Sequence, residues 1–379
     1  MKTLVFAASL LTLTMDVPVQ VPGGHDGTWT AKLRDGWYRN GQERWISFQL
    51  ERREGRERYG IGIPQSELEG LGMRDERWTA ANVRFALQRD AGTVDFQGSF
   101  DEGRGAGTYR FSPRAEYATA MQKRYGQLDD DDLFRLAIHD VSRAFITALE
   151  AQGYRNIALD DLLAMRIHGV DADYISAYKK AGYDNLSIPD LVKTRIHGAT
   201  PRFVQDVRAA GYDRLDVEDL VAMRVHGVTP EFIREMRALG YKDLKIDELV
   251  QLRIHGASPA FIREMRDLGF KDLTLNQAVQ MRIHGVSPGF VKELRSLGYT
   301  DLDVDDLVKM RIHGVTPEYI KELKELGYGN VKAERLVEFR IHGVSPDFIR
   351  EVRAAGFKDM SPQDLVDMSI HGRRWLKKR

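Results

Sequence analysis

The chain has 379 residues and no cysteine, and its 56 Lys and Arg residues balance its 56 Asp and Glu residues to a formal net charge of +0. A balanced charge excludes the strong positive field that gathers nucleic acid or an anionic membrane surface, so we expect no specific nucleic-acid partner. The absence of cysteine excludes a disulfide framework and thiolate-based metal or redox chemistry.

The first 15 residues have the pattern of a secretory signal. One positive charge at Lys2 is followed by the short apolar run TLVFAASLLTLT, which is too short to span a bilayer. No clear cleavage site with small residues follows before Asp16, so an N-terminal strand or an unstructured start is the alternative. We expect a signal segment over residues 1–15 and an exported protein, periplasmic or extracellular, without a transmembrane segment. If residues 1–15 are not a signal, the expected location is the cytoplasm.

Residues 27–111 are expected to form strands. Apolar and polar residues alternate over 46–50, 83–87, 94–100 and 109–111, which is typical of half-buried strands. Turn pairs at 35–36, 40–41 and 91–92 and the glycines of 103–107 are suitable hairpin corners. The pattern predicts a small antiparallel meander, interrupted at 64–80 by a loop or one short helix.

No constellation of catalytic residues is evident in this strand region. His25 stands alone in the sequence, and the glycines of 103–107 are expected in a hairpin turn, not at the start of a helix that could bind phosphate. We therefore expect no enzyme, no catalytic residues and no cofactor. The tryptophans are expected in the core, although Trp37 and Tyr38 beside a turn leave carbohydrate binding as an alternative.

From residue 113 onward the sequence is a tandem repeat of 29 residues. Two copies read MRVHGVTPEFIREMRALGY at 223–241 and MRIHGVTPEYIKELKELGY at 310–328. A histidine marks the same position in every copy: His139, His168, His197, His226, His255, His284, His313, His342 and His371.

Each copy divides into two short helices. In the copy that begins at Thr229, this residue is a helix N-cap and Pro230 occupies the first helical position, so a helix is expected over 230–239 before Gly240. A second helix is expected over 246–255, ended by Gly256 in the left-handed conformation. Sister copies begin this second helix with Ser, Asp or Thr, often in a capping box.

Helices of about ten residues are too short to persist alone in water, so they must stack. The apolar residues expected in the shared core are, in the copy at 229–257, Phe232, Ile233, Met236, Leu239, Tyr241, Leu249, Val250, Leu252 and Ile254. The predicted fold is α+β and mainly α. It has an antiparallel β domain over 27–111 and an α-solenoid over 113–379 of about eight two-helix repeats with atypical first and last units.

The wording of the repeat resembles a known family. The segments RVHGVTPEFI at 224–233 and RIHGVSPDFI at 340–349, with the strand-rich block 83–111 before the repeats, look like an uncharacterised bacterial repeat family. That family occurs as a C-terminal extension of sensor metallopeptidases of the penicillin-sensor antirepressor type. The resemblance implies the helical repeat but no activity, because the His-Glu-x-x-His motif of the peptidase is absent from this sequence.

The histidine row permits three interpretations. Imidazoles are common metal ligands, but copies in stacked helices are about 8–10 Å apart, too far to share one ion, so we expect no metal site. The favoured interpretation is structural: a helix-ending histidine interacts with the terminal carbonyl groups, as at His168, His197, His226, His255, His284, His313 and His342. A pH response of the array is the third interpretation.

An arginine two residues before the histidine also recurs. We expect its methylenes on the core and its head group at a helix C-terminus or a turn acid, which would join adjacent repeats. The alternative is a row of guanidinium groups that binds a polyanion. The residues are Arg166, Arg195, Arg224, Arg253, Arg282, Arg311 and Arg340.

The sequence therefore predicts a non-enzymatic scaffold or interaction module whose partner is another protein or peptide. The alternative is a binder of a repetitive anionic polymer or cell-wall component through the arginine row and the basic C-terminal tail. That tail contains Arg373, Arg374, Lys377, Lys378 and Arg379. The sequence does not predict the oligomeric state.

Overall fold

A computed structural model describes residues 25–33, 44–52, 57–73 and 77–372. The chain forms two compact units, which divide between Ile196 and His197. The expected signal segment at 1–15, the turn pairs at 35–36 and 40–41, Trp37, Tyr38 and the basic tail all lie outside the described residues.

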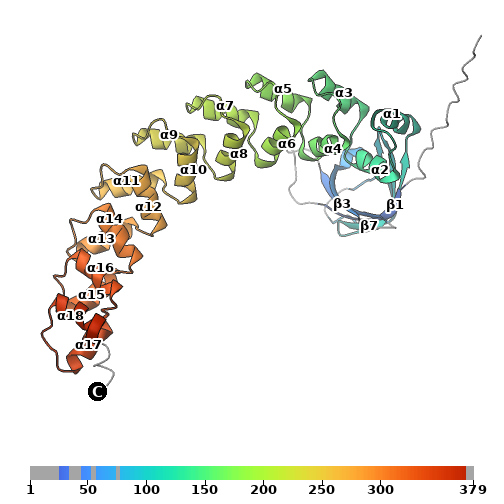
Figure 1. Ribbon diagram of the computed structural model, residues 1–379. Coiled ribbons are helices and arrows are strands. Elements are labelled where there is room, and N and C mark those ends of the chain that lie inside the picture. Colours follow the sequence, from blue (N-terminus) through green and yellow to red (C-terminus); the bar gives the residue numbers. More distant parts are fainter. Residues whose placement is uncertain (1–24, 34–43, 53–56, 74–76, 373–379) are drawn as a thin grey trace, which may run out of the picture. The chain divides into compact units, whose positions relative to one another are not determined.

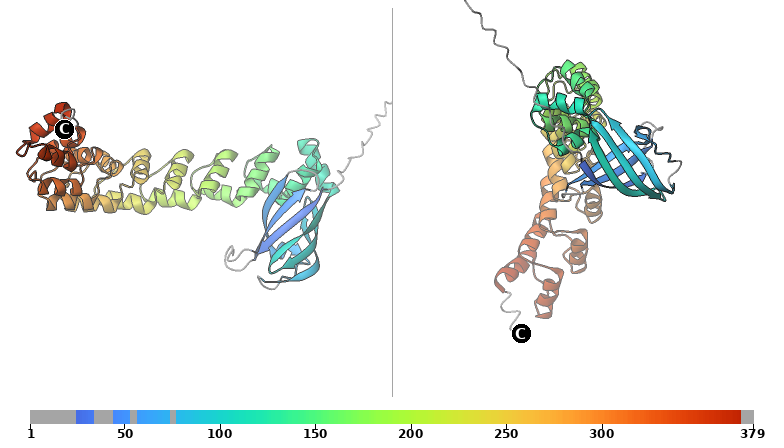
Figure 2. Two further views of the ribbon diagram at one scale, coloured as in Figure 1. Left: turned by 90° about the horizontal axis from the view of Figure 1, so that it is seen from below. Right: turned by 90° about the vertical axis from the view of Figure 1, so that its right-hand side faces the viewer.

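The first unit contains a seven-stranded antiparallel sheet of spatial order β3-β2-β1-β7-β6-β5-β4. Neighbours in sequence pair as in a meander except for β3 and β4, which form the two edges of the sheet. β1 also pairs with β7, so the first and last strands lie side by side in the curled sheet (Figures 1 and 2). The strands are β1 (His25–Leu33), β2 (Trp45–Arg52), β3 (Arg58–Pro64), β4 (Leu68–Glu69), β5 (Ala80–Arg89), β6 (Gly92–Asp101) and β7 (Arg104–Pro113).

The glycines of 103–107 are not all in a turn, contrary to expectation. The turn is made by Glu102 and Gly103, which have positive φ angles, and β7 begins at Arg104. A Cβ on Gly105 would approach the Trp29 ring within 2.6 Å, and one on Gly107 would lie 2.0 Å from a carbonyl oxygen of β6. These glycines therefore let β7 approach β6 over the buried indole of Trp29.

The segment expected as a loop or one short helix contains a three-residue helix, η2 (Gln65–Glu67), followed by the two-residue strand β4. Trp29 is buried in the sheet core as expected, whereas Trp45 and Trp78 are only half-buried.

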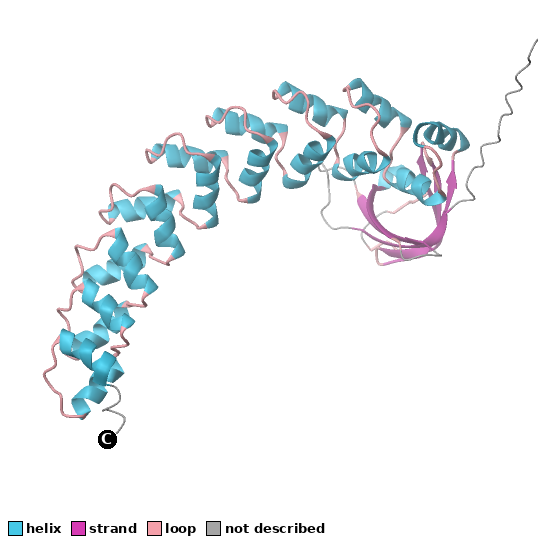
Figure 3. Cartoon of the chain, viewed as in Figure 1, coloured by secondary structure: helices cyan, strands magenta, loops and turns pink. Residues whose placement is uncertain are grey.

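Helices follow the last strand to the end of the described chain (Figure 3). Eight pairs, from α3/α4 to α17/α18, form the two-helix repeats, preceded by α1 and α2. The helices of the first unit are α1 (Ala115–Tyr125), α2 (Asp130–Ile138), α3 (Arg143–Ala151), α4 (Leu159–His168), α5 (Ala172–Lys180) and α6 (Ile188–His197). Those of the second unit are α7 (Pro201–Ala209), α8 (Val217–Val225), α9 (Pro230–Ala238), α10 (Ile246–Ile254), α11 (Pro259–Asp267), α12 (Leu275–Ile283), α13 (Pro288–Ser296), α14 (Val304–Ile312), α15 (Pro317–Glu325), α16 (Ala333–Ile341), α17 (Pro346–Ala354) and α18 (Pro362–Asp367), followed by η3 (Met368–Gly372).

In the second unit, the even-numbered helices form one layer and the odd-numbered helices another. From α8 onward, each helix contacts the next one of its own layer, as α8 contacts α10 and α9 contacts α11 (Figure 1). The residues expected to cap the helix N-termini form the expected hydrogen bonds. Thr229 accepts a hydrogen bond from the Phe232 amide, and a capping box begins α12, α14 and α18.

The core of each repeat is smaller than expected. In the repeat at 229–257, Phe232, Ile233, Met236, Leu249 and Leu252 are buried, while Leu239, Tyr241 and Val250 are half-buried. The prediction for Ile254 is wrong, because its side chain is 50% exposed. Ile254 lies two residues after Leu252, which places it on the opposite side of the helix.

The atypical units obtain their contacts in other ways. Asp140 replaces the helix-ending glycine and adopts its left-handed conformation with φ 54°. Arg143, in the place of proline, binds Asp90 of the β5–β6 turn through both its backbone amide and its guanidinium, at 2.7–2.9 Å. Ser369, in the place of arginine, donates to the His342 carbonyl at 2.6 Å. Each departure from the repeat thus supplies a contact that its end of the array needs.

Among the described residues, no helix combines the length and the apolar character needed to cross a bilayer.

Replacing Gly285 with alanine is expected to lower the free energy of unfolding by about 1–2 kcal/mol, because Gly285 has φ 72° and an L-residue is strained there. The new Cβ would also lie 3.0 Å from the Arg311 guanidinium. Urea denaturation measures the effect.

The matched control is Gly289→Ala in the first turn of α13. The nearest atom to its Cβ would be the Ser287 hydroxyl at 3.7 Å, and we expect this change to stabilise by about 0.5–1 kcal/mol. Equal effects of the two substitutions would contradict the role given to the left-handed glycine.

Candidate functional site: the Arg-Ile-His surface of the repeats

The repeated arginine joins one repeat to the repeat before it. Its guanidinium lies over the helix-ending glycine 26 residues earlier, so that a Cβ on Gly227 would be 3.0 Å from Nη2 of Arg253. Where the hydrogen bond is formed, Nε of Arg195 donates to the Gly169 carbonyl at 2.9 Å. A cation at this place satisfies terminal carbonyls and complements the helix dipole.

The same guanidinium also stacks on an aromatic ring of its own repeat. Arg253 lies 5.2 Å from the centroid of Phe232, within the range of a cation–π contact. The other pairs are Arg166 with Phe145, Arg195 with Tyr174, Arg224 with Phe203, Arg282 with Phe261, Arg311 with Phe290 and Arg340 with Tyr319.

The arginine row is therefore engaged in packing between repeats. In the first repeat Arg166 pairs with Asp140 and donates to the His139 carbonyl, and in a late repeat Arg340 donates to the His313 carbonyl at 3.3 Å. In the later repeats the guanidinium faces the helix-ending glycine of the preceding repeat, and not a turn acid such as Asp243, Asp272 or Asp301.

Two further contacts between repeats escaped the sequence analysis. In several repeats a cation near the end of the odd-numbered helix donates to a carbonyl of the preceding repeat, as Arg266 does to Leu239 at 2.6 Å and Lys179 does to Gln152 at 2.7 Å. The tyrosine after this helix donates to a carbonyl of the following repeat, as Tyr212 does to Leu244 at 2.6 Å. The 29-residue recurrence of both residue types was the available signal.

The histidine row lies at the helix ends, as expected. His168 and His197 are the last residues of α4 and α6, and later copies such as His255 follow directly after a helix. The ring of His255 contacts the Gln251 side chain at 3.1 Å. Within the described part of the chain, no three His, Asp or Glu residues gather in a way that could hold a metal ion.

His139 differs from the later copies. Burial, together with the positive charges of Arg135 and Arg166, lowers the pKa of His139 to about 4. The neutral ring is therefore the form that the folded first unit favours.

The residue directly before the repeated histidine is an exposed apolar side chain in all eight repeats. Its exposed fraction is between 47% and 55%. Among the described residues, Phe357 is the other large apolar side chain with comparable exposure. We call these residues the isoleucine column: Ile167 and Ile196 in the first unit, and Val225, Ile254, Ile283, Ile312, Ile341 and Ile370 in the second.

The column is uniform where its surroundings vary. The residue one helical turn before each member is Ala164, Lys193, Ala222, Gln251, Gln280, Lys309, Glu338 or Asp367. That position therefore tolerates small, polar, acidic and basic side chains, whereas the column holds Ile seven times and Val once. Because folding does not bury these side chains, core packing does not explain their uniformity.

His25 is not isolated, contrary to expectation. It is buried, its Nδ1 lies 3.1 Å from the Tyr109 hydroxyl, and its Nε2 lies 3.4 Å from Asp131 of α2. The ring stacks on Phe134 at 4.1 Å, and the Tyr59 hydroxyl donates to Asp131 at 2.7 Å. Desolvation and the charge of Arg52 lower the pKa of His25, against the opposing effect of Asp131. The cluster joins β1, β3 and β7 to the second helix.

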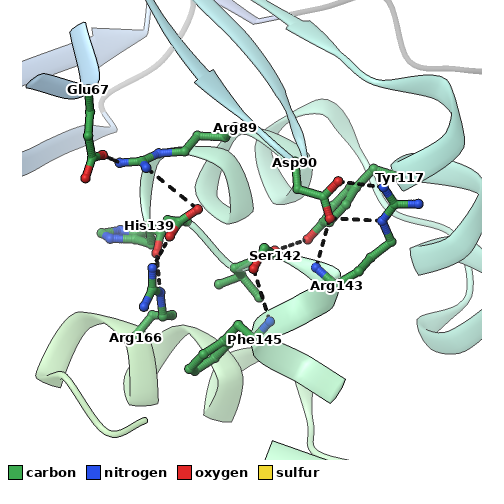
Figure 4. Close-up of polar contacts among 11 residues, drawn as sticks. Glu67, Arg89, Asp90, Tyr117, His139, Ser142, Arg143, Phe145 and Arg166 are labelled. Atoms are coloured by element: carbon green, nitrogen blue, oxygen red, sulfur yellow. Dashed lines mark hydrogen bonds and ion pairs between the residues drawn. The ribbon is translucent and has the colours of Figure 1, made fainter. Parts of the chain in front are cut away.

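A hollow of about 760 Å³ lies in the first unit, between strand β3 and the helix ends of the first repeats. Four of its charged side chains form one cluster. Arg89 binds Glu67, as Figure 4 shows, and lies 3.8 Å from Asp140, which also binds Arg166. Arg166 and Arg195, two of the candidate polyanion-binding residues, line this hollow, and the contacts described above already occupy their guanidinium groups.

Substituting Arg311 with methionine tests the arginine contact. The change keeps an apolar stem but removes the guanidinium from Phe290 and from the helix end at Gly285. We expect a loss of about 1–2 kcal/mol in the free energy of unfolding, the sum of a cation–π contact and a helix-end interaction.

Arg263→Met is the matched control, because Arg263 is exposed and its ion pair with Glu235 spans 3.2 Å. Exposed pairs contribute little, so we expect a change within about 0.5 kcal/mol. The joining role of Arg311 would be refuted by equal losses in urea denaturation.

The thermal midpoint of the first unit is expected to fall between pH 7.5 and pH 5. The folded-state pKa of both His25 and His139 is below the ordinary value, so the unfolded chain binds protons first as the pH falls through about 6.5. The stability that the neutral rings confer is present above that pH and is lost below it. Calorimetry of wild type and His139→Gln measures this effect, and the variant should lose about 1–2 kcal/mol of the pH-dependent change. Melting curves that coincide at both pH values would exclude it.

Comparison with protein-family models finds no match to this sequence, and comparison with curated proteins finds none either. The informative comparison is internal, between the eight repeats. It separates positions that packing explains, such as Arg253, from a position that packing does not explain, such as Ile254.

Proposed function

We propose that this protein is a non-enzymatic interaction module that binds another protein or peptide along the isoleucine column. The observation that carries the proposal is the uniform, half-exposed apolar side chain in every repeat. An exposed apolar row is unfavourable in water, and contiguous apolar surface is typical of protein-binding sites.

The energy available along the column is sufficient for specific binding. Full burial of an aliphatic side chain contributes about 1.5–3 kcal/mol, so the half that remains exposed offers roughly 1 kcal/mol per repeat. The six members in the second unit can therefore contribute several kcal/mol before the costs of association. A ligand must contact several repeats at once to use this energy.

Binding of a repetitive anionic polymer is the second candidate and has less support. It requires guanidinium groups that reach a ligand, whereas each arginine of the row lies over an aromatic ring and a helix end. The basic tail at 373–379 remains as its second element. Export rests on the pattern of residues 1–15 and belongs to the same proposal.

A photo-crosslinking amino acid placed at position 254 or 283 should capture a defined partner in cells that produce the protein. The same amino acid at Arg263 or Lys292, exposed positions of the odd-numbered helices α11 and α13, should capture markedly less, because the column belongs to the even-numbered helices. Mass spectrometry identifies and quantifies the adducts.

Equal capture at both pairs of positions, or none at either, would refute binding along the column. Retention on heparin that is lost with salt would instead favour the polyanion candidate.

A further inference from the structure

The spacing of the isoleucine column defines the shape of the ligand. We propose that the ligand is an extended, acidic peptide in the polyproline II conformation, with an apolar residue at every third position. This proposal rests on the function proposed above. The part of the column that the peptide contacts is Val225, Ile254, Ile283 and Ile312.

The period of the column matches the period of such a peptide. Neighbouring even-numbered helices of the second unit pack directly on one another, which places equivalent residues about 8–10 Å apart. A polyproline II helix has three residues per turn and rises about 3.1 Å per residue, so every third side chain returns to the same face after roughly 9.3 Å. Each repeat thus meets one apolar side chain of the peptide.

The width of the column also favours an extended ligand. Each of these four repeats offers one apolar side chain, with Arg before it and His after it, so the apolar strip is one residue wide. An amphipathic helix buries a strip that covers at least about 100° of its surface, which is wider. A β-strand needs backbone partners, but the column lies on α-helices, whose backbone groups bond within the helix and present no free strand edge. A polyproline II backbone remains hydrated and requires no partner.

Charge selects an acidic peptide over a second copy of this chain. The residues beside these four members, Ala222, Gln251, Gln280 and Lys309, are neutral or basic, and an exposed arginine precedes each of the four. Its guanidinium keeps its contacts with the ring and the helix end, and its positive charge acts on the column from there. Two columns placed face to face would bring these arginines close together, which is unfavourable. Glutamate side chains between the apolar residues of a peptide would instead lie beside these positive groups.

Acidic residues in the last two repeats limit the part of the column that an acidic peptide can contact. Glu338 and Asp367 precede Ile341 and Ile370 by one helical turn, so the last two repeats suit an acidic ligand less well. Four repeats correspond to a peptide of about 12 residues.

The test uses fluorescence anisotropy with the full chain and four labelled peptides. The first peptide is (Pro-Glu-Ile)4. The second has the same composition with isoleucine at irregular spacing, and the third carries Lys in place of Glu. The fourth is an α-helical peptide with isoleucine at every seventh residue, because that spacing also rises about 10.5 Å.

Two matched double variants accompany the wild type. Ile254→Ser with Ile283→Ser removes two members of the column, and Ala260→Ser with Ser296→Ala changes the odd-numbered helices α11 and α13, away from it. All four positions are exposed, so both variants are expected to fold, and circular dichroism melting verifies it.

We expect (Pro-Glu-Ile)4 to bind wild type at least about tenfold more tightly than the irregular and lysine peptides. The isoleucine variant should bind it about tenfold more weakly than wild type, and the control variant in α11 and α13 within about twofold. Preference for the helical peptide, equal binding of regular and irregular peptides, or no loss in the isoleucine variant would each overturn the inference. If crosslinking at 254 and 283 still captures a partner, that failure concerns the peptide conformation alone and leaves the proposed function standing.

Discussion

The contact between neighbouring repeats is the constraint on which this molecule depends. A helix of nine residues gains too little from its own hydrogen bonds to persist in water, so each helix pair is stable only when neighbouring repeats pack against it. Buried side chains such as Phe232 and Leu249 supply the non-directional part of that contact. Arg253 supplies a directional part, because one guanidinium meets a ring of its own repeat and the helix end of the preceding one. Directional contacts fix the offset between repeats, which apolar packing alone leaves loosely defined.

That fixed offset between repeats turns single exposed residues into a surface with a regular period. An exposed isoleucine on a single helix is ordinary, since much of any protein surface is apolar. The same residue held at a constant spacing in successive repeats becomes a row with a defined period. The interior contacts and the proposed binding surface are therefore linked through the spacing of the helices, although they use different residues of the phrase Arg-Ile-His.

The sequence was sufficient to predict local structure but not contacts between distant residues. Thr229, Pro230 and Gly256 act through their immediate neighbours, so the helix limits followed from residue type alone. Residue type alone predicts burial of Ile254, because isoleucine is apolar. Its side chain nevertheless points away from that of the buried Leu252, two residues earlier in the helix, and is exposed. His25 looked isolated because Tyr109 and Asp131, its partners, are 84 and more residues away in the chain. The curled sheet brings these residues together, and no short sequence pattern predicts that arrangement.

The arginine contact is the same at every internal junction, with the guanidinium always directed toward the preceding glycine, as Arg253 is to Gly227 and Arg282 is to Gly256. If one 29-residue unit were deleted or duplicated, the new junction would again place an arginine against a helix-ending glycine, as at the existing junctions. Gene rearrangement can therefore lengthen or shorten this array without the need for new compensating substitutions. Every unit gained or lost changes the number of side chains in the isoleucine column by one, so the length of ligand accommodated would evolve in whole steps while the junction chemistry stays constant.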